Sequence, residues 1–225
     1  IGRLPVLTSQ ELLDYVAMVQ AQEAAPASAW QKSLLFVEDN PDSGGAFPTD
    51  SDAVAALAGS GYEVKKVYLP AYSATTARTA IVDALNAGAL LFNYVGHGAP
   101  GRLADENVFT TANVPSLANA GRLPLFLAMT CSVGNFAIPG FSSLSESLVL
   151  SKTGGAWAAF APSGLSLNDG ARTLNQAFVR SALVDGEKLV GKSAVKALGE
   201  LPSEGATAYM KGIYNVIGEP VSRLP

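Results

Sequence analysis

The stretches LLFNYVGHG (residues 90–98) and LFLAMTC (residues 125–131) share one design. Each is an apolar run of strand length followed at once by a residue that can do chemistry. His97 and Cys131 are the only histidine and the only cysteine in the chain. Continuous apolar runs of this kind are typical of strands in a parallel sheet that is covered on both faces. The two stretches therefore predict parallel strands that each deliver one reactive side chain to the edge of a sheet.

The rest of the chain alternates strand and helix patterns around these stretches. Thr8 and Glu11 form the S/T-x-x-E capping box of a helix over residues 9–23, and LLFV at residues 34–37 predicts a buried strand. A loop over residues 40–49 follows, with two prolines and a glycine pair. This alternation predicts one domain over residues 1–225, a three-layer α/β/α sandwich with a mainly parallel sheet. Further strands are expected at 62–69, 89–95, 123–130 and 155–161, and further helices at 51–59, 75–87, 144–150, 171–184, 193–198 and 206–214.

Composition excludes several classes of function. Apolar residues make up 48% and charged residues 15% of the 225 residues, which indicates a well-buried core and argues against disorder. The net charge is −4 and the Lys and Arg residues form no run, so no nucleic-acid partner is expected. No apolar run approaches the roughly 20 residues of a membrane-spanning helix. A lone cysteine excludes an internal disulfide. The start at Ile1, without an initiator Met or signal segment, indicates a piece excised from a longer chain.

The spacing of His97 and Cys131 predicts that the two side chains meet. Cys131 follows His97 by 34 residues, about the length of one right-handed crossover between parallel strands. If the two strands are neighbours, their ends lie roughly 5 Å apart at the carboxyl edge, where open α/β sheets bind ligands. A lone buried cysteine or a lone loop histidine is unremarkable by itself. Their placement at equivalent strand ends indicates a functional Cys–His dyad.

Other readings of the same residues fail on context. GHGAPG at residues 96–101 has the G-x-G-x-x-G form of a dinucleotide site, but Pro100 and Gly101 continue a loop instead of opening a helix. A phosphatase cradle would place Arg six residues after the cysteine, where Ala137 stands. Zinc requires more Cys and His ligands, and an α/β-hydrolase requires G-x-S-x-G. The interpretation that agrees with this context is nucleophilic chemistry by the Cys131 thiol.

NYVGHG at residues 93–98, followed by a second apolar strand ending in Thr130-Cys131, resembles the gingipain-type cysteine peptidases of the caspase-like clan, clan CD. The resemblance covers nearly the whole chain and implies a caspase-like sheet and cysteine endopeptidase activity. Further matching features follow in family order: Ile1-Gly2-Arg3, an acid after the first core strand, Gly61-Tyr62 before a strand, and Gly218-Glu219-Pro220.

The resemblance assigns catalytic roles to particular residues. It implies that Cys131 is the nucleophile and His97 the general acid/base, with the backbone N–H groups of Gly98 and Cys131 forming the oxyanion hole. It also implies a carboxylate that orients the histidine, for which Asp39 is the first candidate and Glu38 the second. Either acid can instead be an ordinary solvated residue at a strand end.

The resemblance also bears on substrate recognition. Arg-cutting gingipains use an Asp near the start of the helix after the acidic loop, a place that Asp50 or Asp52 occupies here. Either residue can equally be a plain helix N-cap. Ala161, Pro162 and Ser163, after the strand that follows the cysteine, are expected to form another wall of the substrate pocket.

No cofactor is expected to be required. The loop acids Asp39, Asp42 and Asp50 are candidate ligands of a structural calcium ion, as in some relatives, although acids are common in loops of any kind. The resemblance implies a peptide or protein substrate and a bacterial protein that is secreted or on the cell surface. The alternative hypothesis is a non-catalytic caspase-like domain of such a protein that binds a peptide or protein partner.

Overall fold

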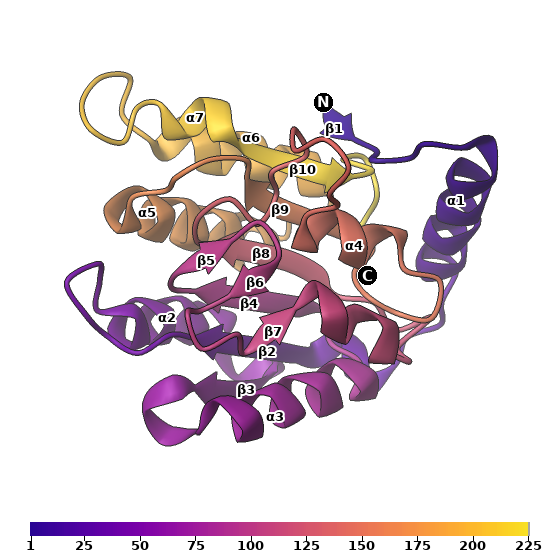
Figure 1. The fold of residues 1–225 in the computed structure, drawn as a ribbon, viewed down its shortest axis with the longest axis horizontal. Coiled ribbons are helices and arrows are strands. Elements are labelled where there is room, and N and C mark those ends of the chain that lie inside the picture. Colours follow the sequence, from indigo (N-terminus) through magenta and orange to yellow (C-terminus); the bar gives the residue numbers. More distant parts are fainter. Residues whose placement is uncertain (225) are drawn as a thin grey trace.

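The computed structural model describes residues 1–224. These residues fold around a seven-stranded sheet (Figure 1). The strand order is β1-β10-β9-β8-β4-β2-β3, and only the β9–β10 pair is antiparallel. The expected mainly parallel α/β/α fold is therefore confirmed. No helix in the described part of the chain has the length and apolar character needed to cross a membrane. The strands are β1 (Gly2–Arg3), β2 (Ser33–Glu38), β3 (Glu63–Tyr68), β4 (Leu91–Val95), β8 (Leu125–Met129), β9 (Ala158–Pro162) and β10 (Tyr214–Gly218).

Helices cover both faces of this sheet (Figure 1). One face packs against α1 (Ser9–Glu23), α3 (Ala74–Ala87), α4 (Leu144–Leu150) and a small antiparallel sheet. The other face packs against α2 (Phe47–Ala55), α5 (Asn168–Val179), α6 (Val190–Glu200) and α7 (Met210–Ile213). The small sheet consists of β5 (Gly98–Ala99), β6 (Arg102–Leu103) and β7 (Phe109–Thr110). Shorter helical segments are η1 (Ala29–Lys32), η2 (Ala56–Gly61), η3 (Leu69–Ala71), η4 (Thr111–Ser116) and the π-helical η5 (Arg180–Val184).

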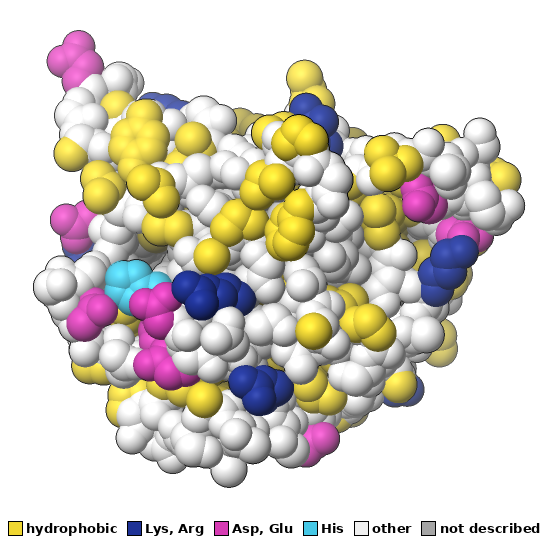
Figure 2. Space-filling model, in the orientation of Figure 1, with side chains coloured by type: hydrophobic (Ala, Val, Ile, Leu, Met, Phe, Trp, Pro, Cys, Tyr) yellow, Lys and Arg dark blue, Asp and Glu magenta, His cyan; other side chains and the backbone are white. Residues whose placement is uncertain are grey.

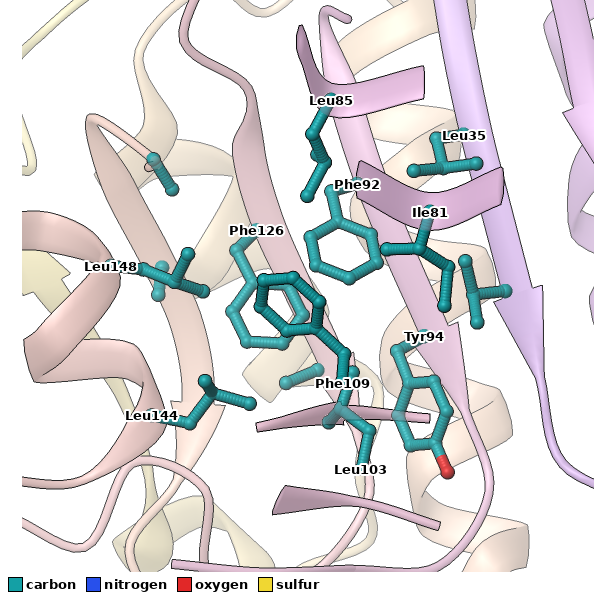
Figure 3. Close-up of a cluster of buried hydrophobic side chains, with 14 of the residues drawn as sticks. Leu35, Ile81, Leu85, Phe92, Tyr94, Leu103, Phe109, Phe126, Leu144 and Leu148 are labelled. Atoms are coloured by element: carbon teal, nitrogen blue, oxygen red, sulfur yellow. The ribbon is translucent and has the colours of Figure 1, made fainter. Parts of the chain in front are cut away.

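The central strands are mostly apolar because both of their faces are buried. Side chains alternate along β4, so Phe92 and Tyr94 join the core on one face while Leu91 and Val95 join the core on the other. Phe92 stacks on Phe126 of β8 with ring centroids 4.7 Å apart. Figure 3 shows these rings with Tyr94, whose hydroxyl lies at the outer end of the cluster. Packing on both faces fixes β4 and β8, and with them the two loops that follow.

Several helix ends lie where the capping signals predicted them. Thr8 caps α1, because its Oγ1 accepts the N–H of Glu11 while the Glu11 carboxylate accepts the N–H of Thr8. Ser143 and Glu146 form the same reciprocal pair at the start of α4. Gly88 ends α3 with a φ of +96°, a conformation that favours glycine. Local sequence signals therefore determine these boundaries.

Other elements differ from the expectation. Helix α2 begins at Phe47 after Ala46, with Pro48 in its first turn, and so starts before Asp50. Asp50 is consequently inside the first turn and is not the N-cap. Residues 214–218 form β10, antiparallel to β9, where the sequence predicted only the end of a helix. The connection from β4 to β8 contains the short helix η4 and also the small sheet, which the sequence did not predict.

Candidate active site

Three neighbouring strands place the predicted site residues at one edge of the sheet. Val95 of β4 pairs with Met129 of β8 and with Glu38 of β2. The N–H of Gly96 donates to the Met129 carbonyl at 3.3 Å, so the β4–β8 ladder continues to the last residue before His97. His97 and Cys131 each lie two residues beyond the paired Val95 and Met129. The expected direct adjacency of these two strands is confirmed.

Cys131 and His97 face one pocket of about 190 Å³. Among the described residues, no hydrogen bond joins the Cys131 thiol to the His97 ring. Figure 2 shows the histidine at the surface, beside acidic side chains and on the same face as exposed apolar groups. The remaining lining residues come from the loop before α2, the ends of β4 and β8, and the start of α5: Gly44, Phe47, Gly96, Met129, Thr130, Ser166, Leu167, Asn168 and Ala171.

The Cys131 thiol is held by the backbone of Ser166. The Ser166 N–H donates to Sγ at 3.3 Å, and Sγ lies 3.6 Å from the Ser166 carbonyl oxygen. Both backbone groups of Ser166 therefore lie within hydrogen-bond reach of the sulfur. The segment after β9 therefore fixes the sulfur at the pocket wall.

The His97 ring is held by the loop before α2. Nε2 lies 2.9 Å from Oδ2 of Asp42, and the ring of Phe47 meets the imidazole edge to face with centroids 5.4 Å apart. Gly44 lets this loop approach, because a Cβ there would lie 2.9 Å from Cε1 of the ring. The Gly44 N–H and the hydrogen bond with His97 hold the pKa of the Asp42 carboxyl below its ordinary value. Asp42 is thus an ionised partner for the imidazole.

Asp39 holds the backbone of His97 and does not contact its ring. The buried Asp39 carboxylate accepts the His97 N–H at 3.0 Å through Oδ2 and the Asn40 N–H at 2.9 Å through Oδ1. The hydroxyl of Tyr94 donates to the His97 carbonyl at 2.6 Å. Burial raises the pKa of Asp39, and the two N–H donors offset part of that rise. The carboxylate beside the imidazole is therefore Asp42, where the sequence had favoured Asp39.

Substitutions at the two acids separate their contributions. Asp42→Asn is expected to lower kcat about tenfold, because the imidazole loses its charged partner, without lowering Tm, since this pair is partly exposed. Asp39→Asn is expected to lower the free energy of unfolding by about 1–3 kcal/mol, because an amide cannot accept through both atoms and leaves one buried N–H unpaired. Peptide hydrolysis rates and urea unfolding measure the two effects. The reverse pattern would contradict these assignments.

Glu38, the second candidate for the orienting acid, points away from the site chemistry. Its side chain is fully buried, and neither carboxylate oxygen has a hydrogen-bond partner. Burial raises the pKa of Glu38 to about 8, and the negative charge of Asp52 adds to this rise. The nearby hydroxyls of Tyr68 and Ser51 and the Lys66 cation lower the pKa in part. Burial therefore favours the protonated form of the Glu38 carboxyl.

Glu38 makes stability depend on pH. The carboxyl has an ordinary pKa of 4.5 when unfolded, so between about pH 4.5 and about 8 the folded chain binds more protons than the unfolded chain at this group. Its contribution to stability is complete below that range and is lost as the pH rises through it. Glu38→Gln is expected to flatten the decline of the unfolding free energy over this range, measured by urea unfolding at each pH. Equal slopes for both proteins would refute the assignment.

Gly98, one of the predicted oxyanion donors, lies close to the backbone of Cys131. The Ala104 N–H donates to the His97 carbonyl, so the next pair of the β5–β6 ladder, Gly98 and Leu103, falls at a non-hydrogen-bonded position. The Gly98 N–H is thus directed away from this ladder. A Cβ at Gly98 would lie 2.4 Å from Oγ1 of Thr130 and 3.2 Å from the Cys131 carbonyl oxygen. Glycine is required there for close approach to the loop that carries the cysteine.

The residues expected to bind substrate lie behind the pocket or away from it. Asp52 binds Lys66 and the Tyr68 hydroxyl at the β3 edge of the sheet. Asp50 is nearly buried and accepts a hydrogen bond from Asn168 at 2.8 Å. None of the predicted wall residues lines the pocket, because residues 166–168 form that wall instead. The predicted wall residues support the loop after Cys131 from behind, where Pro162 accepts the Gly134 N–H: Ala161, Pro162 and Ser163.

The candidate calcium ligands do not gather. Asp39 accepts backbone N–H groups, Asp42 binds His97, and Asp50 binds Asn168. Within residues 1–224, no group of three or more His, Cys, Asp or Glu side chains is arranged to hold a metal ion. A structural calcium ion stays a prediction without a ligand cluster to support it.

Several site residues were not singled out as such from the sequence. Asp42 was noted only as a calcium candidate, although its place in a glycine-rich loop after a strand-end acid is a usable signal. Ser166 acts through its backbone, for which no side-chain signal exists. Tyr94 lies in the NYVGHG motif, and its hydroxyl on an otherwise apolar strand marks it as a residue with a polar partner.

A mainly parallel α/β/α sheet with a thiol and an imidazole at adjacent strand ends defines the caspase-like class of cysteine peptidase folds. A model of the family described as Peptidase family C25 matches residues 1–225. The chain belongs to peptidase family C25, the gingipain family. The resemblance seen in the sequence is thereby confirmed.

Solved structures show the same fold. The crystal structure of the Arg-specific cysteine proteinase gingipain R matches with a TM-score of 0.84 at 20% identity, covering 100% of this chain and 56% of that one. The complex of the pro- and mature domains of RgpB from Porphyromonas gingivalis gives 0.83 at 20% identity, with coverages of 100% and 57%. A third structure, described only as a protease, gives 0.75 at 17% identity, with coverages of 97% and 54%. A search of curated proteins gave no match. The chain spans just over half the length of these structural relatives.

Proposed function

We propose that this chain is the catalytic unit of a cysteine endopeptidase that hydrolyses peptide bonds in proteins. The observation that carries the proposal is the single pocket shared by the Cys131 thiol and the His97 imidazole at neighbouring strand ends. Membership of peptidase family C25 supports the same activity. A thiol and an imidazole facing one pocket provide the nucleophile and the proton carrier that amide hydrolysis requires.

In the first half of the reaction, the Cys131 thiolate attacks the carbonyl carbon of the scissile bond. The N–H groups of Gly98 and Cys131 are the proposed donors to the oxyanion that forms. His97 then donates a proton to the leaving amine, and the C–N bond breaks to give a thioester on Cys131. In the second half, His97 takes a proton from water, the hydroxide attacks the thioester, and the acid product leaves as Sγ regains its thiolate.

The groups around the dyad keep it in position through both halves. Asp42 orients the imidazole that donates to the amine. Asp39 and Tyr94 clamp the N–H and the carbonyl of His97, so the ring turns about a fixed backbone. The Ser166 N–H holds Sγ where the substrate carbonyl must approach. Asp39, Tyr94 and Ser166 are thus positioning residues.

We infer protein or peptide substrates and a place outside the bacterial cell or on its surface from family membership. Exposed apolar side chains beside the pocket, on Leu165, Leu167 and Tyr209, give an extended peptide an apolar surface to lie against. The Tyr209 hydroxyl donates to the Leu165 carbonyl at 3.0 Å, which joins these segments into one rim.

Digestion of a denatured proteome tests the proposal. The untreated chain is expected to generate new peptide termini, and the chain pretreated with iodoacetamide is expected to generate none, because its single thiol is blocked. Mass spectrometry reads both the new termini and the alkylation of Cys131. An alkylated thiol without any hydrolysis before treatment would favour the rival function, a non-catalytic domain that binds a peptide or protein partner.

A further inference from the structure

The carboxylate of Asp50 is compensated by an arginine and an asparagine of the same chain. Asp50 lies in the first turn of α2 and is 7% exposed. Its Oδ2 accepts from Nδ2 of Asn168 at 2.8 Å, and its Oδ1 lies 3.5 Å from NH1 of Arg172. Both partners come from α5. A nearly buried carboxylate is stable in such a place only when a cation and hydrogen-bond donors compensate it, and Arg172 and Asn168 do so.

Helix α5 is itself fixed against the sheet beside the pocket. Asn175 of α5 and Asn93 of β4 are both buried, and each amide donates to the other at 2.6 and 3.1 Å. This reciprocal pair satisfies both side chains and ties the helix to the strand that leads to His97. The start of α5, including Asn168, is therefore held in a defined position at the pocket.

Asn168 separates Asp50 from the pocket. Phe47, Asn168 and Ala171 line the pocket, whereas Asp50 and Arg172 do not. A carboxylate only accepts hydrogen bonds, so the Asn168 amide must turn its nitrogen to Asp50, which leaves its oxygen as the atom free to meet a ligand. The other lining side chains are largely apolar, including Met129 and Leu167. The pocket thus offers largely apolar walls together with neutral polar atoms, among them the Asn168 oxygen and Oγ1 of Thr130.

We propose that Arg172 and Asn168 make this pocket select an uncharged side chain of the substrate next to the scissile bond; this rests on the proposed peptidase function. A cationic side chain would lose its hydration on entry and would find Asp50 already paired, with a second cation beside it. Arg172 also pairs with Asp169 at 3.1 Å, but Asp169 is 82% exposed and water screens its charge. Apolar and neutral polar side chains carry no such cost.

Benzamidine and benzamide test this selection, because they have nearly the same shape and differ in charge. Their binding to the chain carrying Cys131→Ala is measured by titration calorimetry, so that no chemistry intervenes. The pocket is expected to show no preference for benzamidine, and adding Arg172→Gln is expected to raise benzamidine affinity about tenfold by freeing the Asp50 charge. Tighter binding of benzamidine than benzamide before that substitution, or no gain after it, overturns the inference.

Matched variants complete the test. Arg180→Gln removes the same charge from η5, which follows α5 and lies away from the pocket, and is expected to change neither affinity. If Arg172→Gln fails to fold by circular dichroism, Asp50→Asn replaces it. That change is expected to leave benzamidine affinity unaltered, and a loss of benzamidine binding would show that the carboxylate serves the pocket.

Cleavage profiles separate this inference from the peptidase assignment. Cuts after uncharged residues support both. Cuts mainly after Arg or Lys by the unchanged chain would uphold the peptidase and overturn the selection. No cuts at all, together with the gain of benzamidine binding on Arg172→Gln, would refute the peptidase and leave the pocket chemistry standing.

Discussion

Replacing Cys131 by alanine is expected to abolish peptide hydrolysis, with a fall in kcat of at least about 10⁴-fold. The sulfur is the one thiol of the chain and it faces the pocket that His97 shares. Without it, no covalent intermediate can form, and the remaining oxyanion donors and binding groups retain only a residual rate over water. Hydrolysis of a fluorogenic peptide mixture measures the loss.

The fold is expected to survive this change. Cys131 is only partly buried, and its sulfur contacts the backbone of Ser166, so alanine leaves no large cavity in the core. Far-UV circular dichroism and Tm therefore serve as the control, and both should match those of the unchanged chain. Hydrolysis by the alanine variant within tenfold of the unchanged rate would show that another nucleophile does the chemistry.

The architecture could be predicted because its signals are local. Runs such as LLFV at residues 34–37 are apolar throughout, and only a sheet buried on both faces accommodates them. The capping pairs at Thr8 and Ser143 begin helices α1 and α4 by satisfying free backbone N–H groups, and such bonds need no tertiary partner. The length of the connection between residues 97 and 131 indicated a right-handed crossover and hence two parallel strands.

The elements that were missed depend on contacts between distant residues. Residues 214–218 form a strand because they pair with β9 in antiparallel orientation. A short apolar run in the sequence does not predict such a pairing. Strands β5, β6 and β7 contain two residues each, too few for any periodic signal. The start of α2 at Phe47 came from Pro48, whose fixed φ suits a first turn, while the acids further along suggested a later start.

The site, too, has features that the sequence could predict and features that depend on contacts between distant residues. The placement of His97 and Cys131 at one edge of the sheet was predictable, because their strands are parallel and end at the same edge. The acid that contacts the imidazole was not predictable from the sequence. Asp39 and Asp42 are only three residues apart, and the path of the loop between them and the ring depends on Gly44 and Phe47. Asp39, at the end of its strand, binds the backbone N–H of His97, whereas Asp42, further along the loop, contacts the imidazole ring.

Replacing His97 by alanine is the second change with a large expected effect, and it separates proton transfer from thiol reactivity. General acid–base catalysis by a positioned side chain contributes 10²–10⁴-fold, so kcat is expected to fall about 10³-fold. No hydrogen bond joins the imidazole to the thiol in residues 1–224, whereas the Ser166 N–H donates to Sγ. Alkylation of Cys131 by iodoacetamide is therefore expected to slow by less than about tenfold.

Labelling and turnover must be measured on the same preparations for this contrast to hold. Asp42→Asn provides the matched control, because it keeps the imidazole and removes only the partner of Nε2, so it should lose far less activity than the alanine variant. Equal losses of alkylation and turnover in His97→Ala would mean that the histidine activates the sulfur directly. In that case the imidazole must move toward Sγ before substrate binds, and the held position beside Asp42 would be a resting position that the reaction leaves.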